Sequence, residues 1–240
     1  MSSEGPATLD TQRLNRPGRR VGLVVKALAD LVGALLLLVV LSPVLIVCAV
    51  AIKLDSPGSV LFVQKRLGLK GTLFGICKFR TMVPNAAKLG TGLQTREGDP
   101  RITRVGAILR KYRLDELPQL INVVKGEMSL VGPRPLVPDF LEGYAEADKQ
   151  RLLMKQGMTG WQQVNGAGTH TWAQRIKADM WYIEHWSLWL DLVILLRTIA
   201  VVLRADTVYG KDGWESSGIP TALAPQDADS DTSTEENERP

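Results

Sequence analysis

Two adjacent carboxylates, Asp115 and Glu116, follow a run of cations and are the residues best suited to chemistry. Arg110, Lys111 and Arg113 lie just before them in the chain. Cations at this distance lower the pKa of a carboxyl group and keep it ionised. An ionised carboxylate can attack a phosphoryl group and form an acyl phosphate. Successive helical side chains point about 100° apart, so Glu116 is better suited to hold a metal or to orient Asp115 than to attack the same atom.

Phosphoryl chemistry at this pair would need a divalent cation to neutralise the phosphates. Oxygen ligands with an open coordination shell suit magnesium, so we predict Mg²⁺ at Asp115 and Glu116. A simpler explanation is that Asp115 caps the helix that follows and that the cations form surface ion pairs. Residue types and spacing alone favour this simpler explanation, because acidic caps are common.

A second set of cations is suited to binding phosphate. It comprises Lys78 and Arg80 in the segment KFRTM, Arg101, and Arg134 between two prolines. An arginine fixed by flanking prolines is pre-organised for bidentate contact with phosphate. Taken one at a time, these residues would equally fit a solvated basic face. The turn-rich segment 157–166 could form a nucleotide or sugar pocket or a simple connection.

These residues must be positioned by elements near a long apolar segment, Leu31 to Ile52, which Ser42 and Pro43 interrupt. As one helix the segment would rise roughly 33 Å, about the thickness of a bilayer's hydrocarbon core. Pro43 removes the N–H that would bond to the Val39 carbonyl, and the Ser42 hydroxyl can satisfy a carbonyl freed by this break. The segment can therefore span a membrane as a kinked helix, or enter and leave on the same side.

The charges beside this segment bear on that choice. The basic flanking residues are Arg13, Arg16, Arg19, Arg20 and Lys26 before it, and Lys53, Lys65, Arg66, Lys70, Lys78 and Arg80 after it. Basic residues next to membrane segments favour the cytoplasmic side, and only a re-entrant hairpin satisfies both flanks. The two arrangements remain about equally favoured, with the charges tipping the balance towards the hairpin.

The remaining pattern predicts an α+β fold that is mostly helical. Segments 60–63 and 72–76 are typical of two strands of a small β-hairpin. Helices are predicted at 102–111 and 115–124, the second from apolar residues spaced along one helical face. The apolar stretch 186–204 is interrupted by charges and is too short to span. It suits an interfacial helix lying in the headgroup plane or, nearly as well, a buried core helix.

Composition sets the limits of the folded part. The chain has 240 residues, a formal net charge of +4 and a pI near 9.1, although acidic residues crowd its last twenty positions. Cys48 and Cys77 suit small buried side chains, and the two histidines have no zinc-binding spacing. The basic remainder fits anionic lipid or a phosphorylated substrate, while no nucleic-acid motif accompanies it. We predict a disordered N-terminus at 1–20, a membrane hairpin at 21–54, a catalytic domain at 55–210 and a disordered acidic tail at 211–240.

Taken together, the segments resemble the bacterial sugar transferase family, the monotopic phosphoglycosyl transferases, from about residue 22 to 210. The matching segments are 64–68 (QKRLG), 78–82 (KFRTM), 99–103 (DPRIT), 109–119 (LRKYRLDELPQ), 122–123 (NV), 126–135 (GEMSLVGPRP), 157–161 (GMTGW) and 163–166 (QVNG). So many strings in the same order make the resemblance specific, and it outweighs the capping and solvated-face explanations.

The resemblance implies a re-entrant hairpin broken at Ser42–Pro43 in the inner membrane, with the catalytic domain on the cytoplasmic face. It implies transfer of a sugar-1-phosphate from a UDP-sugar to polyprenol (undecaprenyl) phosphate with release of UMP, the first membrane step of a glycoconjugate or exopolysaccharide pathway. Asp115 would carry a covalent sugar-phosphate, assisted by Glu116 and Mg²⁺. Arg110 would bind phosphate or a lipid headgroup, and Arg134 would lie near the phosphates.

Two alternatives remain. A membrane-anchored protein could bind anionic lipid through its basic face without catalysis, and an ordinary glycosyltransferase would release UDP in place of UMP. The sequence leaves the donor sugar, the lipid length, the pathway and the oligomeric state open, and a homodimer is compatible with it.

Overall fold

The structure is a computed structural model of the 240-residue chain. It describes residues 17–86, 89, 95, 98–138, 149–166 and 172–204. The predicted disorder at 1–20 and 211–240 falls outside these ranges except for residues 17–20. Those four residues are helical, so that part of the prediction is wrong.

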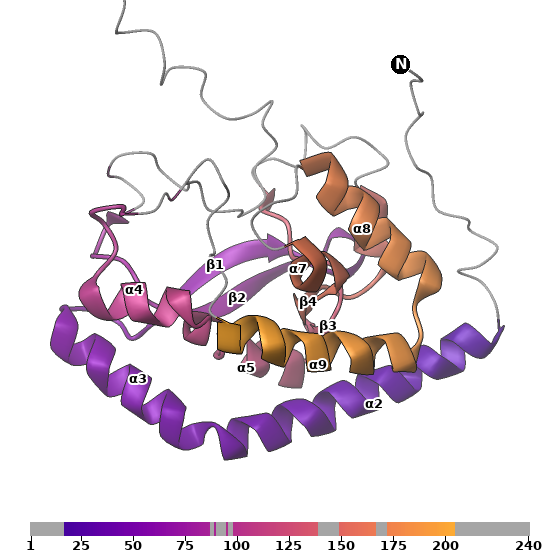
Figure 1. Ribbon diagram of the computed structural model, residues 1–240, viewed down its shortest axis with the longest axis horizontal. Helices are drawn as coiled ribbons and strands as arrows, with labels where there is room; N and C mark the ends of the chain where they lie inside the picture. The colour runs from indigo at the N-terminus through magenta and orange to yellow at the C-terminus, as the bar shows by residue number, and fades with distance from the viewer. Residues whose placement is uncertain are drawn as a thin grey trace, which may run out of the picture.

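Two helices form the base of the molecule, α2 (Pro17–Val40) and α3 (Ser42–Asp55), and they meet at Leu41. The Ser42 hydroxyl donates a hydrogen bond to the Val39 carbonyl at 2.8 Å, as the sequence predicted for a carbonyl freed by the proline. The helices make an open V beneath the rest of the chain, and both outer ends rise towards the same side (Figure 1). Over Gly18–Val40, α2 is long and apolar enough to cross a membrane.

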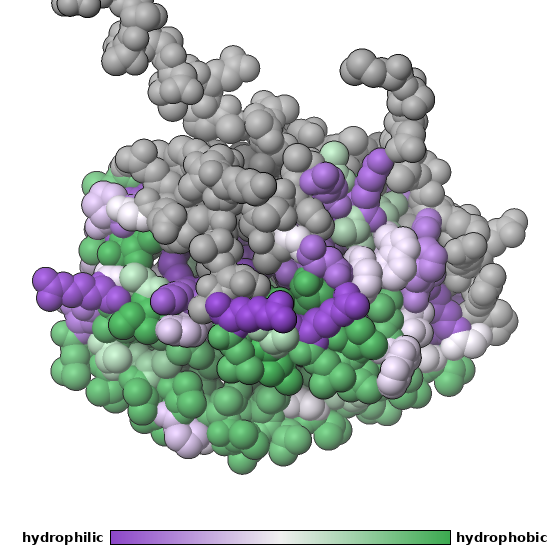
Figure 2. Space-filling view, viewed as in Figure 1, coloured by the Kyte–Doolittle hydropathy of each residue, from purple (hydrophilic) through white to green (hydrophobic). Residues whose placement is uncertain are grey.

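The outer surface of this V is apolar. Side chains more than half exposed on the two helices are Val21, Val24, Leu28, Val32, Leu36, Val39, Val40, Ile46, Val47, Val50 and Leu54. Apolar residues cover the lower face of the molecule, over the bend of the V and up to α9 (Figure 2). A soluble monomer rarely exposes such a continuous patch, so this surface has the character of a lipid-facing one.

Above the V lies the predicted β-hairpin, strands β1 (Leu61–Leu67) and β2 (Leu73–Phe79). The strands are antiparallel, and Leu67 pairs with Leu73 at the closed end. Lys70 and Gly71 in the turn have φ of 54° and 79°, where glycine is unstrained and lysine is not. The small hairpin is confirmed, and its strands are longer than the predicted segments 60–63 and 72–76.

A second pair of strands, β3 (Ser129–Val131) and β4 (Gly157–Thr159), is parallel and was not predicted. Each strand has only three residues, which is too few for an alternation to be recognised. Segment 157–166 supplies β4 and the short helix α7 (Trp161–Gly166). A β-carbon on Gly157 would lie 2.0 Å from the Gly132 nitrogen, so this glycine permits close backbone contact.

The helix predicted at 115–124 is wrong as a continuous helix. After α4 (Arg104–Lys111) the chain forms a 3₁₀ turn, η3 (Leu114–Glu116), and then the short helix α5 (Gln119–Val124). Pro118 has no N–H to donate to the Leu114 carbonyl, which accepts instead from the Leu117 nitrogen three residues on, at 3.2 Å. The proline therefore tightens the turn that carries the two carboxylates.

The C-terminal part of the domain consists of η5 (Gln150–Leu153), α8 (Trp172–His185) and α9 (Leu188–Arg204). The helix predicted at 186–204 is present, and it combines features of both proposed settings. Ile194 is fully buried in the core, whereas Trp189 and Leu203 are 71% and 78% exposed.

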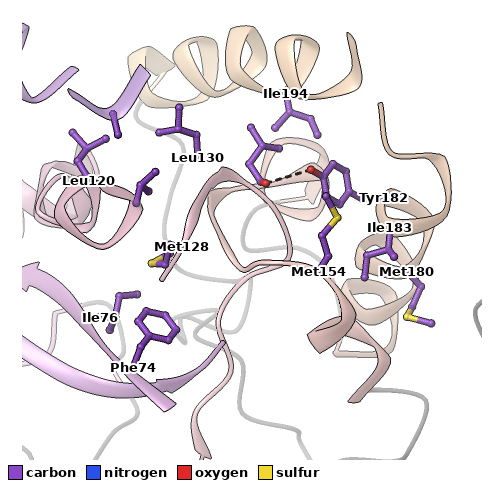
Figure 3. Close-up of a cluster of buried hydrophobic side chains, with 13 residues drawn as sticks. Phe74, Ile76, Leu120, Met128, Leu130, Met154, Met180, Tyr182, Ile183 and Ile194 are labelled. Carbon is purple, nitrogen blue, oxygen red and sulfur yellow. Dashed lines mark hydrogen bonds between the residues drawn. The ribbon is translucent and has the colours of Figure 1, made fainter. Parts of the chain in front are cut away.

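One hydrophobic core joins these elements (Figure 3). Its buried members are Ala34, Phe74, Ile76, Leu120, Val123, Met128, Leu130, Val131, Met154, Met180, Tyr182, Ile183 and Ile194. The Tyr182 hydroxyl donates its proton to Asp191 Oδ1 at 2.6 Å and lies 3.3 Å from the Val131 carbonyl, so the largest buried side chain also satisfies its polar atom. The core fixes α5, α8, α9 and both sheets against α2.

Buried charges also attach α2 to the domain. Lys26 Nζ lies 2.7 Å from Asp191 Oδ2 on α9 and 3.7 Å from Asp30 Oδ2, one turn along α2. Asp30 accepts a bond from the Ser129 hydroxyl, and Asp191 accepts one from Tyr182 at 2.6 Å. Lys26 was counted with the headgroup-facing basic flank, and the structure corrects this, since its side chain is 6% exposed.

Candidate active site

Glu116 is the centre of a cluster drawn from three segments. Lys78 Nζ on β2 lies 3.0 Å from Glu116 Oε1, and Arg134 Nη2, from the Pro-Arg-Pro segment after β3, lies 3.2 Å from the same oxygen. The side chains are 13% to 24% exposed. Two of the cations predicted separately are thus brought to the predicted carboxylate pair.

The cations decide the ionisation of Glu116. Burial alone would raise its pKa, but Lys78, Arg134 and Arg113 together hold the pKa of Glu116 well below its usual range. Glu116 is therefore a permanent anion at physiological pH. It is unsuited to act as a general acid and well suited to orient cations around a phosphorylated substrate.

Asp115 is half-buried and lies in the same 3₁₀ turn. Residues of a 3₁₀ helix follow one another at three per turn, so Asp115 and Glu116 point about 120° apart. The N-cap positions of η3 and α5 belong to Arg113 and Pro118. Asp115 is therefore not the N-cap of the helix after it, which removes the simpler explanation for its presence.

Arg113 is a site residue that the sequence reasoning did not select. Its φ of 54° places it in the left-handed region, which costs a non-glycine residue about 1–3 kcal/mol. This backbone turns the chain sharply between α4 and the dyad and leaves the Arg113 charge close to Glu116. Residue type gave no signal, because arginine is not a residue that usually occupies a left-handed turn.

Asn122 was also missed, and it connects the dyad to the hairpin. It is completely buried; its Oδ1 accepts from the Cys77 nitrogen at 2.9 Å and its Nδ2 donates to the Gly75 carbonyl at 2.7 Å. These two hydrogen bonds join the backbone of strand β2 to helix α5. They fix the distance between Lys78, the next residue on β2, and the dyad that precedes α5.

Arg110 lies on α4 and faces the loop before that helix. Its Nε donates to the Thr81 hydroxyl at 2.9 Å. A β-carbon on Gly106, one turn earlier, would lie 2.1 Å from the Thr81 carbonyl oxygen, so glycine allows α4 to pack this closely. Arg110 also lies close enough to Asp99 and Arg101 for their charges to interact.

Two predicted phosphate-binding residues have structural partners elsewhere. Arg80 donates to the Ser56 and Pro57 carbonyls at 2.7 and 2.8 Å, where α3 leads into β1. Arg101 is 5% exposed; it pairs with Asp99 at 2.7 Å and donates to the Leu89 carbonyl at 2.8 Å. The structure thus does not bring these two guanidinium groups to Glu116, as it does Lys78 and Arg134.

The donor set at the dyad is compatible with magnesium. No group of three or more His, Cys, Asp or Glu side chains gathers within the described ranges. Magnesium is often held by one or two carboxylates together with substrate phosphates, so a pair of carboxylates is sufficient. Both ion pairs of Glu116 use Oε1, and Oε2 is the oxygen that could face an ion.

Comparison with known proteins gives this arrangement its context. Residues 21–205 match the family model of bacterial sugar transferases. The chain belongs to the bacterial sugar transferase family. The match includes α2 from residue 21, all of α3, the dyad and every residue of the Glu116 cluster.

Three relatives illustrate the range of the family. A UDP-glucose:undecaprenyl-phosphate glucose-1-phosphate transferase of Caulobacter vibrioides is 45% identical over 216 residues, 85% of this chain and 80% of that protein. The uncharacterized sugar transferase EpsL of Bacillus subtilis is 40% identical over 78% of this chain and 91% of its own length. An undecaprenyl-phosphate galactose phosphotransferase of Salmonella typhimurium is 39% identical over 81% of this chain.

The relatives differ in length. The matched part makes up 44% of the Salmonella protein and 42% of an uncharacterized sugar transferase of Haemophilus influenzae, which is 42% identical. This sugar transferase therefore spans less than half the length of some curated relatives and most of the length of others.

Proposed function

We propose that the protein transfers a sugar-1-phosphate from a UDP-sugar to undecaprenyl phosphate and releases UMP, as the first membrane step in assembling a bacterial glycoconjugate or exopolysaccharide. The observation that carries the proposal is the joining of Lys78 and Arg134 at Glu116, beside Asp115, on a domain with a lipid-facing base. Relatives named as undecaprenyl-phosphate glucose and galactose phosphotransferases support the choice of reaction.

Neither step of this transfer needs an added acid or base. A carboxylate oxygen of Asp115 attacks the phosphorus that carries the sugar, and the bond from that phosphorus to the bridging oxygen breaks. UMP leaves with the electron pair, and the sugar phosphate remains on Asp115 as an acyl phosphate. A phosphate oxygen of the lipid then attacks the same phosphorus, which restores the carboxylate and gives the lipid diphosphate sugar.

The cluster around Glu116 would stabilise this transfer. Lys78 and Arg134 present positive charge where negative charge accumulates on the phosphoryl oxygens, and they are held in place before substrate arrives. Magnesium, held by Asp115 and Glu116, would neutralise the diphosphate and the departing UMP. Arg110, on the neighbouring helix, would bind a phosphate or a lipid headgroup.

The base of the molecule supports a re-entrant, monotopic placement at the cytoplasmic face of the inner membrane. The V opens towards the domain, so both its ends and the dyad lie on the same side of the apolar surface (Figure 1). A substrate with an apolar tail and one with a polar nucleotide could then reach one site without either crossing the membrane.

The test is nucleotide release by the purified protein in detergent or nanodiscs with Mg²⁺, undecaprenyl phosphate and a panel of UDP-sugars. We expect UMP, and a lipid diphosphate sugar as the second product. Release of UDP would identify an ordinary glycosyltransferase and refute the proposal.

The covalent step is tested without the lipid acceptor. Wild-type protein should release UMP in proportion to the enzyme and gain one sugar phosphate on Asp115, detected by intact-protein and peptide mass spectrometry. Asp115→Asn keeps the size of the side chain and should remove both the burst and the adduct. Wild-type activity in Asp115→Asn would overturn the assignment of the nucleophile, whereas steady turnover without a burst would favour direct attack by the lipid phosphate.

A further inference from the structure

The segment that carries Arg134 is held by hydrogen bonds to its backbone carbonyls. The Pro133 carbonyl accepts from the Gly157 nitrogen at 2.9 Å, and the Leu136 carbonyl accepts from the Leu67 nitrogen at 2.9 Å. Between them, the Arg134 carbonyl accepts from Arg151 Nη2 at 3.4 Å. The prolines fix φ, and these bonds fix the path of the chain, so the Arg134 side chain begins from a rigid base.

Arg151 is itself fixed by a buried carboxylate. Its Nη2 also pairs with Asp179 Oδ2 on α8, and the two residues are 3% and 1% exposed. The buried Gln156 donates to the Arg151 carbonyl at 3.1 Å and so holds the η5 turn from the other side. One guanidinium nitrogen therefore connects α8 to the backbone of Arg134.

A buried ion pair is weak support for stability. Removing both charges from water costs several kcal/mol per ion, and replacing such a pair with apolar residues of similar volume is often neutral or stabilising. An orienting role remains, because Arg151 contacts the backbone of a residue that reaches Glu116. Asp179 also lies close enough to Arg134 for their charges to interact.

We propose that Arg151 and Asp179 are positioning residues that hold Arg134 in register with Glu116 and thereby with the phosphates of the donor. This inference rests on the proposed function, since it assigns Arg134 to the diphosphate. In this arrangement Asp179 orients Arg151, Arg151 holds the Arg134 carbonyl, and Arg134 meets Glu116. Neither positioning residue needs to touch the substrate.

A double-mutant cycle tests the connection. Arg134→Lys is made in the wild type and in the Arg151→Met/Asp179→Leu background, where the pair is replaced by apolar side chains. If the pair acts through Arg134, Arg134→Lys should lower kcat/KM for the UDP-sugar about tenfold or more in the wild type and only about two- to threefold in the apolar background. Arg151→Lys serves as a milder variant if the apolar pair does not fold.

The matched control is a second buried pair, Lys26–Asp191, replaced in Lys26→Met/Asp191→Asn; neither residue contacts Arg134. Its effect on kcat/KM should add to that of Arg134→Lys, because packing damage alone creates no coupling. Thermal melting of every variant separates lost stability from lost positioning.

The same cycle is measured on the affinity for UDP, a diphosphate probe that needs no turnover. Coupling through Arg134 in kcat/KM or in UDP affinity supports the inference. Additive effects in both measurements, in a wild type that releases UMP, overturn it while leaving the proposed function intact. A wild type that neither turns over a UDP-sugar nor binds UDP refutes the proposed function and this inference together.

Discussion

Replacing Lys26 by methionine distinguishes two roles for a lysine in α2. A cation facing headgroups or solvent contributes about 0–1 kcal/mol to stability. In the structure, Lys26 is paired with Asp191 at 2.7 Å and with Asp30 at 3.7 Å. At an effective dielectric constant of about 20 these separations correspond to roughly 6 and 4.5 kcal/mol of attraction, much of it offset by desolvation.

Lys26→Met would leave two buried carboxylates without their cation, which typically costs about 3–5 kcal/mol. For a domain of this size that corresponds to a fall in Tm of roughly 6–20 °C. The assay is thermal unfolding of the detergent-solubilised protein followed by circular dichroism. Arg20→Met is the matched control, because Arg20 is an exposed cation on the same helix.

A second variant tests the cause of the loss. In Lys26→Met/Asp191→Asn one of the two unpaired charges is gone, and the single amide oxygen of the asparagine can still accept one of the two hydrogen bonds that Asp191 takes from Tyr182 and Trp186 on separate oxygens. It should therefore melt above Lys26→Met alone. If Lys26→Met melts within about 2 °C of Arg20→Met, the lysine is not buried in an ion pair and our account of how α2 is attached is wrong.

Four further predictions follow from the site and the membrane helices. Asn122→Ala should cost about 2–4 kcal/mol, measured by thermal unfolding, because it leaves the Cys77 N–H and the Gly75 carbonyl unpaired; an unchanged Tm would contradict this. Arg113→Gly should relieve about 1 kcal/mol of backbone strain while lowering kcat/KM, so a variant less stable than wild type would count against the strained turn. The pKa of Glu116 is lower in the folded state, so its stabilising effect is complete above its ordinary value of 4.5 and declines as pH falls; the Tm difference between wild type and Glu116→Gln should shrink below that pH, and a constant difference would refute the pKa shift. Single cysteines placed at Ser3 and Ser59 in an otherwise cysteine-free chain should be labelled from the same side of sealed vesicles, whereas labelling from opposite sides would identify a spanning helix.

The sequence correctly predicted those elements that depend on residues close together in the chain. Pro43 and Ser42 gave the bend and its hydrogen bond, because a missing N–H frees one particular carbonyl. Two short apolar segments and the glycines between them gave the hairpin. Asp115–Glu116, Lys78 and Arg134 were noted from residue types and surroundings, but only the family resemblance favoured a site over a helix cap and a solvated basic face.

The features that were missed depend on long-range contacts. Arg80 and Arg101 look like phosphate ligands in sequence, yet each satisfies backbone carbonyls or a carboxylate that the fold brings to it. The prediction of one helix at 115–124 was wrong because the spacing of apolar residues does not indicate which carbonyl Pro118 leaves without a donor. Asn122 appeared in the sequence only within a segment of the family resemblance, and its role could not be predicted, since its partners lie about 45 residues away on β2.

The site is best understood as the meeting point of two attachments. Asn122 sets α5 and the dyad against β2, which places Lys78 at Glu116. The Pro-Arg-Pro segment is set separately, by β3, β4 and Arg151, which places Arg134 at the same oxygen. Because α2 packs against both α5 and β3, it is the element common to the two halves.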